Sequence, residues 1–330
     1  MRIAVDAMGG DYAPTEIVAG ALQGARLHGL ALSLVGDPAA IKRELTGVET
    51  SDVDLEIVPA PDAIRMEEEP VQAVRERPGA SINVACRLVM ERGAAGALTM
   101  GHTGAGTVAA LLNYGRIPGV ERPAVIVPFL GLRPDLFLID AGANTEVSPS
   151  RLYQFAIMGT AYAKGAAGIP SPRVGLISNG SEPGKGNKVG REAFTLLAAA
   201  KDLNFIGNIE GHTMLSSGVN VVVSDGFTGN VLFKGAEGIV DCLFTQVEEV
   251  LDRLPQEAKV TLESHLGLLR KRNNYASYGV AALLGVKFPM FIGHGRSKAE
   301  AVINGMATAK RMIAADVVGE IQRAMDQQDA

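Results

Sequence analysis

Short runs of aliphatic and β-branched residues alternate along this chain with longer helical patterns, and this alternation restricts the fold more than any other feature. The runs are nearly continuous in apolar residues, as expected for strands that are covered on both faces. Parallel strands need crossover connections, which helices usually supply. The alternation therefore predicts an α/β protein in which helices cover a mostly parallel sheet.

The apolar runs predict strands at Ile3–Asp6, Ser33–Val35, Leu55–Val58, Gly96–Thr99, Ala124–Val127, Phe137–Asp140, Val174–Ile177, Phe205–Ile209, Val219–Ser224 and Met290–Ile292. Helical patterns predict helices at Thr15–His28, Pro38–Thr46, Ile82–Arg92, Thr107–Tyr114, Pro149–Lys164, Gly190–Lys201, Val231–Leu254 and Ala299–Asp326. No long Pro-, Gly- or Ser-rich linker divides the 330 residues, so we expect one domain over residues 1–330.

Residues 231–272 differ from the rest because they contain no strand pattern. Apolar residues recur every three or four positions up to Leu254, and Pro255 ends that helix. A second amphipathic helix follows, so the segment is predicted to be a helical hairpin inserted in the α/β protein. Two roles stay open for it. It packs on its own domain or in a dimeric four-helix bundle, or its tip also touches a membrane. The membrane contacts would be Leu262, Leu266, Arg270 and Lys271.

Composition excludes several classes of protein. The 31 basic and 36 acidic residues leave a net charge of −5, which argues against duplex binding, and only 5% of residues are aromatic. We therefore expect no nucleic-acid partner. The chain has 2 cysteines and no His-Glu-x-x-His motif, so neither a disulfide scaffold nor a metal site is expected.

The start of the chain and its hydropathy predict a cytoplasmic location. Asp6 stands where a signal peptide would need apolar residues. No run of about 18 apolar residues is present, so no membrane-spanning helix is expected.

Glycine-rich loops follow several predicted strands, at the place where open α/β sheets bind ligands. In the loop after the first strand, Gly9 and Gly10 permit a tight turn and close approach of a ligand. Residues 100–107 open a helix, so their backbone N–H groups favour an anion. His102 in that loop is either a donor or an ordinary satisfied polar group. Asn144, after a later strand, either donates to a ligand oxygen or turns the chain.

Three further loops carry polar side chains. Lys185 lies in a Gly-rich loop that suits a phosphate or an acidic partner. The loop at residues 224–230 presents Asp225, Thr228 and Asn230 between glycines. His294 follows the last strand and is a possible donor at another anion site.

Several familiar chemistries lack their motif. The stretch from Gly104 to Ala109 fits only the loosest dinucleotide fingerprint, because the next strand ends without an acidic residue. The loop around Lys185 departs from a P-loop at the first glycine and at the Ser or Thr that binds magnesium. No Gly-x-Ser-x-Gly elbow is present, which excludes the usual serine hydrolase arrangement.

Taken together, these loops resemble the bacterial PlsX family, the phosphate acyltransferases of phospholipid synthesis. The resemblance runs in order from Met1 to about Met312. The motifs that carry it are Asp6-Ala7-Met8-Gly9-Gly10-Asp11, Met66 to Arg75, Gly101-His102-Thr103-Gly104-Ala105, Asp140 to Asn144, Lys185-Gly186-Asn187, Asp225-Gly226-Phe227-Thr228-Gly229-Asn230, Tyr275 to Gly279, Leu284-Gly285-Val286-Lys287 and Gly293-His294-Gly295.

The resemblance implies transfer of a long-chain acyl group from acyl carrier protein to inorganic phosphate, giving an acyl phosphate for phosphatidic acid synthesis. It also implies a three-layer α/β/α fold like that of isopropylmalate dehydrogenases and phosphotransacetylases, a homodimer, and peripheral association with the inner face of the cell membrane. A glycerol-3-phosphate acyltransferase would be the downstream enzyme. No cofactor is implied. The family usually has Asn where this chain has His102.

On this basis we assign provisional roles. The catalytic candidates are Lys185, Asn187, Asp225, Asn230 and His294. The substrate- and phosphate-binding candidates are Asp6, Gly9, Gly10, His102, Thr103, Gly104, Asn144, Thr228 and Gly229. In the hypothesis, the loop 101–107 and Lys185 hold phosphate together, Asn230 or Asn144 stabilises the oxyanion, Asp225 orients Lys185 or Asn230, and His294 protonates the leaving thiolate.

Two other functions remain open at this point. A phosphotransacetylase-like enzyme would use acyl-CoA in place of the acyl carrier protein. A non-catalytic scaffold would recruit lipid enzymes to a membrane through the hairpin.

Overall fold

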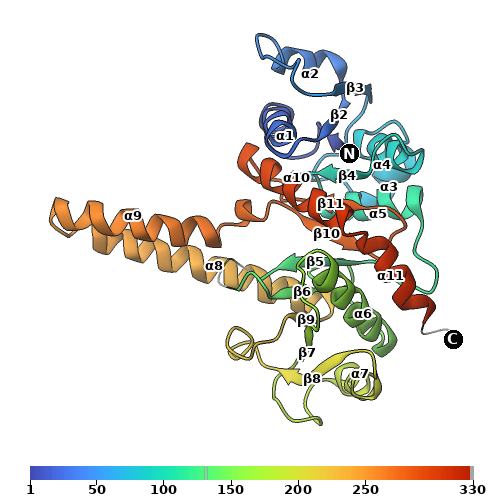
Figure 1. The fold of residues 1–330 in the computed structure, drawn as a ribbon, viewed down its shortest axis with the longest axis vertical. Coiled ribbons are helices and arrows are strands. Elements are labelled where there is room, and N and C mark those ends of the chain that lie inside the picture. Colours follow the sequence, from blue (N-terminus) through green and yellow to red (C-terminus); the bar gives the residue numbers. More distant parts are fainter. Residues whose placement is uncertain (130, 132, 328–330) are drawn as a thin grey trace.

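The computed structural model describes residues 1–129, 131 and 133–327, and their strands form one eleven-stranded sheet in the order β3-β2-β1-β4-β11-β10-β5-β6-β9-β7-β8 (Figure 1). The strands are β1 (Arg2–Asp6), β2 (Ala31–Gly36), β3 (Leu55–Pro59), β4 (Gly96–Thr99), β5 (Ala124–Pro128), β6 (Phe137–Ile139), β7 (Arg173–Ile177), β8 (Asn204–Ile209), β9 (Val221–Val223), β10 (Ala281–Leu284) and β11 (Met290–Ile292). The helices are α1 (Thr15–His28), α2 (Pro38–Glu44), α3 (Pro70–Glu76), α4 (Ser81–Met90), α5 (Thr103–Tyr114), α6 (Pro149–Gly165), α7 (Lys188–Ala199), α8 (Gly226–Leu251), α9 (Gln256–Asn273), the short 3₁₀ helix η1 (Tyr275–Ser277), α10 (Ala299–Ala314) and α11 (Val317–Asp326).

The sheet consists of two parallel sets of strands that run in opposite directions. β1, β2, β3, β4 and β11 form one set, and β6, β7, β8 and β9 form the other. Between them, β10 pairs antiparallel with β11 and β5, and β5 pairs antiparallel with β6. The carboxyl ends of the two sets therefore lie along opposite edges of the sheet, at the two ends of the strands. We call the edge where β1, β4 and β11 end the first rim, and the edge where β6, β7 and β9 end the second rim.

Helices cover both faces of the sheet and give the three layers that were predicted. Buried side chains of α1, α6, α7, α10 and α11 share one apolar cluster with one face of the sheet. Those of α3, α4, α5 and the start of α8 share a second cluster with the other face. The burial of both sheet faces explains why the strands read as continuous apolar runs.

The structure differs from the sequence prediction at three elements. β10 was missed, because its sequence Ala-Ala-Leu-Leu favours a helix and contains no β-branched residue. α3 was also missed; it begins at Pro70, and the Glu69 carboxylate accepts its first free N–H groups. The last predicted helix is two helices, because Asp316 adopts a left-handed φ of 47° and starts α11.

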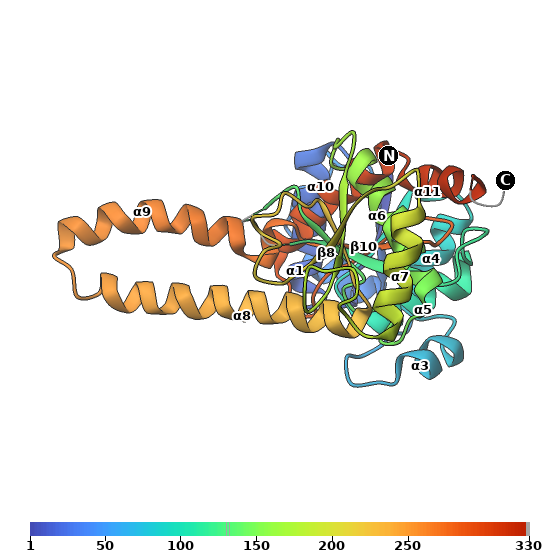
Figure 2. The same ribbon diagram turned by 90° about the horizontal axis from the view of Figure 1, so that it is seen from below.

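The predicted hairpin is confirmed and projects away from the sheet as α8 and α9 (Figure 2). α8 begins at Gly226, earlier than predicted, on the second rim. Phe233 of α8 is buried against Phe129 and Tyr278, which lie at the first rim, so the helix crosses the sheet before it leaves the body. No residue of α9 is buried. The exposed large apolar side chains of α8 and α9 are Phe227, Val231, Ile239, Leu243, Val250, Val260, Leu262, Leu268 and Leu269.

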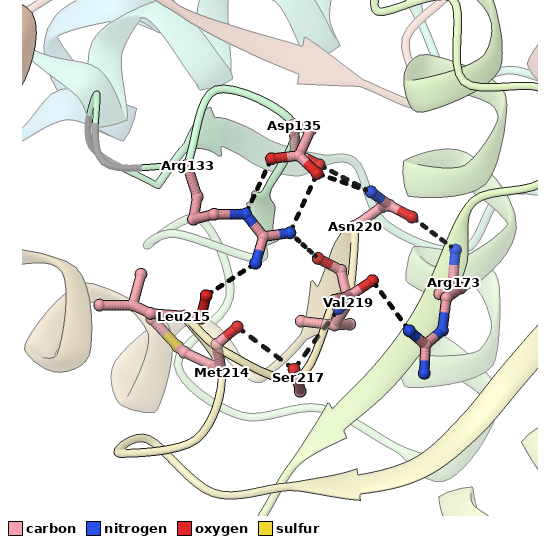
Figure 3. Close-up of polar contacts among 9 residues, drawn as sticks. Arg133, Asp135, Arg173, Met214, Leu215, Ser217, Val219 and Asn220 are labelled. Atoms are coloured by element: carbon pink, nitrogen blue, oxygen red, sulfur yellow. Dashed lines mark hydrogen bonds and ion pairs between the residues drawn. The ribbon is translucent and has the colours of Figure 1, made fainter.

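A polar network ties the start of β6 to the starts of β7 and β9 (Figure 3). Arg133 donates to Asp135 at 2.8 and 3.0 Å and to the carbonyls of Leu215 and Val219. The buried Asn220 accepts from the Arg173 backbone N–H and donates to Asp135. The hydrogen bonds from Arg133 lower the pKa of Asp135, so this carboxylate is charged at neutral pH.

We expect Asn220→Ala to lower the free energy of unfolding by about 1–3 kcal/mol, because the partly buried groups that it bridges lose their partner. Asn204→Ala is the matched control, since the exposed Asn204 amide makes one hydrogen bond, to Ser171. Its effect should stay within about 0.5 kcal/mol. Urea denaturation measures both. Equal effects of the two substitutions would contradict the bridging role.

Candidate functional site

Three helices begin next to one another at the second rim and surround a cleft of about 840 Å³. They are α6, α7 and α8, which follow β6, β7 and β9 in the chain. Free backbone N–H groups and the positive ends of three helix dipoles make such a place favourable for an anion. The cleft is lined by Thr145, Glu146, Val147, Leu152, Leu176, Ile177, Ser178, Asn179, Gly186, Asn187, Val189, Gly190, Ser224, Asp225, Phe227 and Thr228.

Two of the predicted catalytic residues precede α7: Asn187 lines the cleft, and Lys185 lies in the loop just before the lining residue Gly186. Asn187 caps the helix by accepting the Gly190 N–H at 2.8 Å. Lys185 is exposed in the preceding loop, and its stem lies across Gly180, where an added Cβ would be 2.6 Å from the lysine Cγ. The absence of a side chain at Gly180 therefore leaves room for the lysine stem to lie close to the loop.

The wall from α8 begins with a helix cap rather than with an ion pair. The Asp225 carboxylate accepts the Thr228 N–H and the Thr228 hydroxyl, both at 2.8 Å. Within the described residues it has no salt bridge to Lys185. In this structure Asp225 thus shapes the start of α8, which differs from the expectation that it orients Lys185 or Asn230.

Asp140 organises the neighbouring loop. Its carboxylate is completely buried and accepts N–H groups from Val125, Gly142, Ala143 and Asn144. Burial raises its pKa, while these hydrogen bonds oppose the rise. The sequence analysis placed Asp140 in a loop motif but gave it no role. The strand-Asp-Gly pattern was the available signal.

Asn144 is occupied in this loop. Its side-chain amide donates to the Pro123 carbonyl and to Asp140, both at 2.8 Å. Both amide hydrogens are therefore used within the protein. This geometry favours the turn-forming alternative for Asn144 over that of an oxyanion donor.

Asn230 lies one helical turn into α8 and faces the same loop. Its side-chain amide donates to the Ala141 carbonyl at 3.1 Å, and a Cβ added at Gly142 would be 2.9 Å from that amide nitrogen. Gly229 is closer still, since a Cβ there would be 2.1 Å from the Asp140 carbonyl oxygen. The predicted Gly229-Asn230 pair thus lets the helix approach the loop.

Ser178 was missed by the sequence analysis. It follows β7 and lines the cleft, and its buried hydroxyl has no hydrogen-bond partner in the part of the chain that the structure describes. A buried hydroxyl without a partner is costly, so this group is suited to meet a polar ligand. No pattern in the sequence distinguished it from other serines.

The remaining candidates gather at the first rim. Asp6 is buried and accepts the Thr99 hydroxyl at 2.7 Å and the Met8 N–H at 3.2 Å. Burial raises its pKa. Gly9 is required here, because an added Cβ would be 2.6 Å from the Asp6 and Thr99 oxygens. Gly10 has a φ of 112° and lies against the Gly295 loop.

His102 caps α5 in this structure. Its Nδ1 accepts the N–H groups of Gly104 and Ala105 at 2.9 and 3.4 Å. An Asn side-chain oxygen, which the resemblance leads us to expect here, would serve the same purpose, so the cap is retained with His102. Thr103 is the first residue of the helix.

His294 is half-buried at the first rim, where it follows β11. Burial, together with the positive charges of Arg296 and Lys234, lowers its pKa to about 4. The imidazole is therefore neutral at pH 7, and its ring packs edge-on against Tyr275. That His294 protonates the leaving thiolate stays a prediction.

The two groups of candidates lie on opposite rims of the sheet. The loop 101–107 follows β4 at the first rim, whereas Lys185 follows β7 at the second rim. Within one chain the sheet therefore separates this loop from Lys185. The expectation that they hold one phosphate together conflicts with the strand directions, which the sequence pattern does not reveal.

Three of the predicted membrane contacts, Leu262, Leu266 and Arg270, recur every four residues and so lie along one face of α9. Leu262 is 43% exposed, while Leu266 lines a gap between α8 and α9. Arg270 forms an ion pair with Glu248 across that gap, and Lys271 lies 3.7 Å from Glu300.

Neither a metal site nor a membrane span is found in the described ranges. No group of three or more His, Cys, Asp or Glu side chains is arranged to hold a metal ion among residues 1–129, 131 and 133–327. In the same residues, no helix combines the length and the apolar character needed to cross a bilayer.

Comparison with known proteins gives a consistent result. The family described as "Fatty acid synthesis protein" matches residues 1–320. A phosphate acyltransferase of Thermus thermophilus is 46% identical over 326 residues, which cover 98% of each chain. That of Nostoc punctiforme is 42% identical over 326 residues, covering 98% of this chain and 96% of the relative.

Solved structures resemble the fold at low sequence identity. EutD phosphotransacetylase from Staphylococcus aureus has a TM-score of 0.60 at 17% identity and covers 96% of this chain and 94% of its own. A 4-hydroxythreonine-4-phosphate dehydrogenase from Klebsiella pneumoniae has a TM-score of 0.56 at 15% identity, covering 95% and 99%. These similarities confirm the three-layer, phosphotransacetylase-like fold.

We expect Gly229→Ala to lower the free energy of unfolding by about 1–3 kcal/mol, because the new methyl group would overlap the Asp140 carbonyl oxygen. Gly235→Ala in the same helix is the matched control. No atom lies within 4 Å of its added Cβ, so it should stabilise the helix by about 0.5–1 kcal/mol. Urea denaturation compares the two. The same sign of effect at both positions would refute the close approach.

Proposed function

Because this chain belongs to the phosphate acyltransferase family, we propose that it transfers a long-chain acyl group from an acyl carrier protein to inorganic phosphate. An oxygen of the phosphate dianion attacks the thioester carbonyl carbon, the C–S bond breaks, and the proton of the hydrogen phosphate passes through water to the departing thiolate. The product is an acyl phosphate, which a glycerol-3-phosphate acyltransferase would consume for phosphatidic acid synthesis. The observation that carries the proposal is the convergence of three helix N-termini on one cleft, lined by polar and apolar side chains, at the second rim.

Phosphate binds in this cleft at the starts of α7 and α8. The dianion accepts hydrogen bonds from backbone N–H groups of these helices and from the Ser178 hydroxyl. Lys185 adds a positive charge from its flexible loop. Holding phosphate here against the thioester makes the attack effectively intramolecular, which lowers the barrier.

The oxyanion that forms at the carbonyl needs a donor. Asn230 supplies it in this proposal, because its amide nitrogen is engaged with one carbonyl while that of Asn144 is engaged with two acceptors. One donor of this kind contributes about 3 kcal/mol to the transition state. No step of the reaction requires a metal or a nucleotide.

The carrier protein would dock beside the mouth of the cleft. Lys185, Lys188 and Arg191 are exposed there and form a local basic patch although the whole chain is acidic. Phe227 is 63% exposed on the lining of the same cleft. An acidic carrier would be attracted by the cations and would bury the aromatic ring.

Acyl-CoA is the second candidate donor, and the phosphotransacetylase-like fold favours it. Comparing turnover of palmitoyl-carrier protein with that of palmitoyl-CoA separates the two. The basic patch predicts faster reaction with the carrier and a steep fall with added salt. Equal rates at every salt concentration would favour acyl-CoA.

We expect Asn230→Ala to lower kcat by about a hundredfold, which is typical of the loss of one oxyanion donor. Lys185→Ala should mainly raise KM for phosphate, by about tenfold, since one charge-assisted hydrogen bond is lost. Phosphate-dependent formation of acyl phosphate, trapped with hydroxylamine, measures both. Lys201→Ala, an exposed lysine after α7, is the control. Near-native kinetics for both Asn230→Ala and Lys185→Ala would contradict the assignment of these two residues to the active site.

We also propose that the hairpin makes a homodimer and holds the enzyme at the inner face of the cytoplasmic membrane. Its exposed apolar side chains support this role, because large exposed apolar patches usually have a partner. A four-helix bundle formed with a second hairpin would cover the apolar residues on the flanks of both helices. The tip would remain free to touch lipid.

We expect Leu262→Glu to abolish binding to phosphatidylglycerol vesicles in a flotation assay, because the carboxylate cannot enter the apolar part of the bilayer. Leu262→Glu with Leu266→Glu should have the same effect and should also loosen the hairpin. Ser264→Glu on α9 is the control for the added charge. Unchanged flotation of Leu262→Glu, with the dimer intact by light scattering, would refute the membrane role.

A further inference from the structure

A second large cavity, of about 900 Å³, lies between the base of the hairpin and the body of the protein. Its walls come from the end of β5, the start of β6, the last turn of α6, the base of α9 and the outer face of α10. The apolar and aromatic members of the wall are Pro128, Pro134, Phe137, Tyr162, Ala166, Ala167, Leu268, Leu269 and Tyr278. The cavity belongs to the first rim and is separate from the acyl-transfer cleft.

The floor of the cavity is held by hydrogen bonds and ring contacts. Asn304 donates to the Ala276 carbonyl at 2.7 Å, and Thr308 donates to the Tyr278 carbonyl at 3.1 Å. The Tyr278 hydroxyl donates to Glu237 at 3.2 Å. Phe137 and Tyr162 pack edge to face with centroids 5.2 Å apart. These contacts preform the apolar wall, so little ordering is needed when a ligand enters.

The charged residues that line the cavity are all of one sign. Lys271, Arg272 and Arg311 are basic, and neither Asp nor Glu belongs to its described lining. Arg311 is exposed, and its guanidinium donates to the Thr308 hydroxyl at 3.1 Å, leaving further donors free. An apolar cavity with cations at its mouth is complementary to a molecule that has one apolar chain and an anionic head.

We propose that this cavity binds a single-chain anionic amphiphile, namely a long alkyl or acyl chain that carries a phosphate. The alkyl or acyl chain of the ligand lies along the aromatic and aliphatic wall, and its phosphate contacts Arg311 and Arg272 at the mouth of the cavity. The identity of the natural ligand rests on the proposed function, since an acyl phosphate has this chemistry.

The test is an equilibrium binding measurement on the full chain, so that its result does not depend on turnover. Dodecyl, tetradecyl and hexadecyl phosphate are titrated calorimetrically below their critical micelle concentrations. Each added methylene should tighten binding about fourfold until the cavity is filled. Stoichiometry should be one per chain. Hexadecanol, which lacks the anion, should bind more weakly.

Two variants locate the ligand. Ala166→Phe should fill part of the cavity, so that the gain in affinity stops at a shorter chain length. Arg311→Gln should weaken hexadecyl phosphate by about tenfold and leave hexadecanol unchanged. Ala198→Phe on α7 and Arg253→Gln after α8 are the matched controls, and both positions are exposed and remote from the lining. Circular dichroism checks that every variant folds.

Three results would overturn the proposal. They are binding that appears only above the micelle concentration, equal effects of Ala166→Phe and Ala198→Phe, and saturation by phosphatidylglycerol vesicles with no binding of monomeric hexadecyl phosphate. The last result would assign the cations to a lipid surface instead. If the protein binds hexadecyl phosphate in this way but shows no acyl transfer to phosphate, the result counts against the proposed function and not against the cavity.

Discussion

The reversal of strand direction at the centre of the sheet is the constraint on which the rest of this structure depends. β10 and β5 are the only described strands with antiparallel neighbours on both sides, and their backbone hydrogen bonds join two parallel sets that point opposite ways. Parallel sets place their ligand-binding loops at their carboxyl ends. The reversal therefore creates two separate rims with functional loops, where a wholly parallel sheet would have one.

Each rim is built around a buried aspartate that ends a strand. The carboxylates of Asp6 and Asp140 both accept hydrogen bonds from backbone N–H groups or a hydroxyl. Burial raises the pKa of both. Removing such a carboxylate would leave several buried donors unpaired, which costs more than the mean hydrogen bond. Glycines beside these residues are then required by space, as Gly9 and Gly229 demonstrate. The loops thus owe their shape to these acids, and the ligand-facing groups are their neighbours.

Sequence periodicity was sufficient for the layers, the hairpin and most strands, because apolar runs and helical spacing report burial directly. It failed at β10, where a short strand uses helix-favouring residues, and at the convergence of the loops. The latter depends on strand direction, which is set by long-range pairing and has no local signature. The same limit hid Ser178 and the neutral state of His294, since both follow from what packs around them.

α8 is the element that connects the two rims. It starts at the second rim with Asp225, presents Asn230 to the Asp140 loop, and reaches the first rim one and two turns later. Asn230, Lys234 and Glu237 lie at intervals of four and three residues, so they share one face of the helix. Lys234 lowers the pKa of His294, and Glu237 accepts from Tyr278, which walls the amphiphile cavity. Because one rigid helix carries all three side chains, the position of α8 sets the geometry of the Asp140 loop and of the Tyr278 wall together.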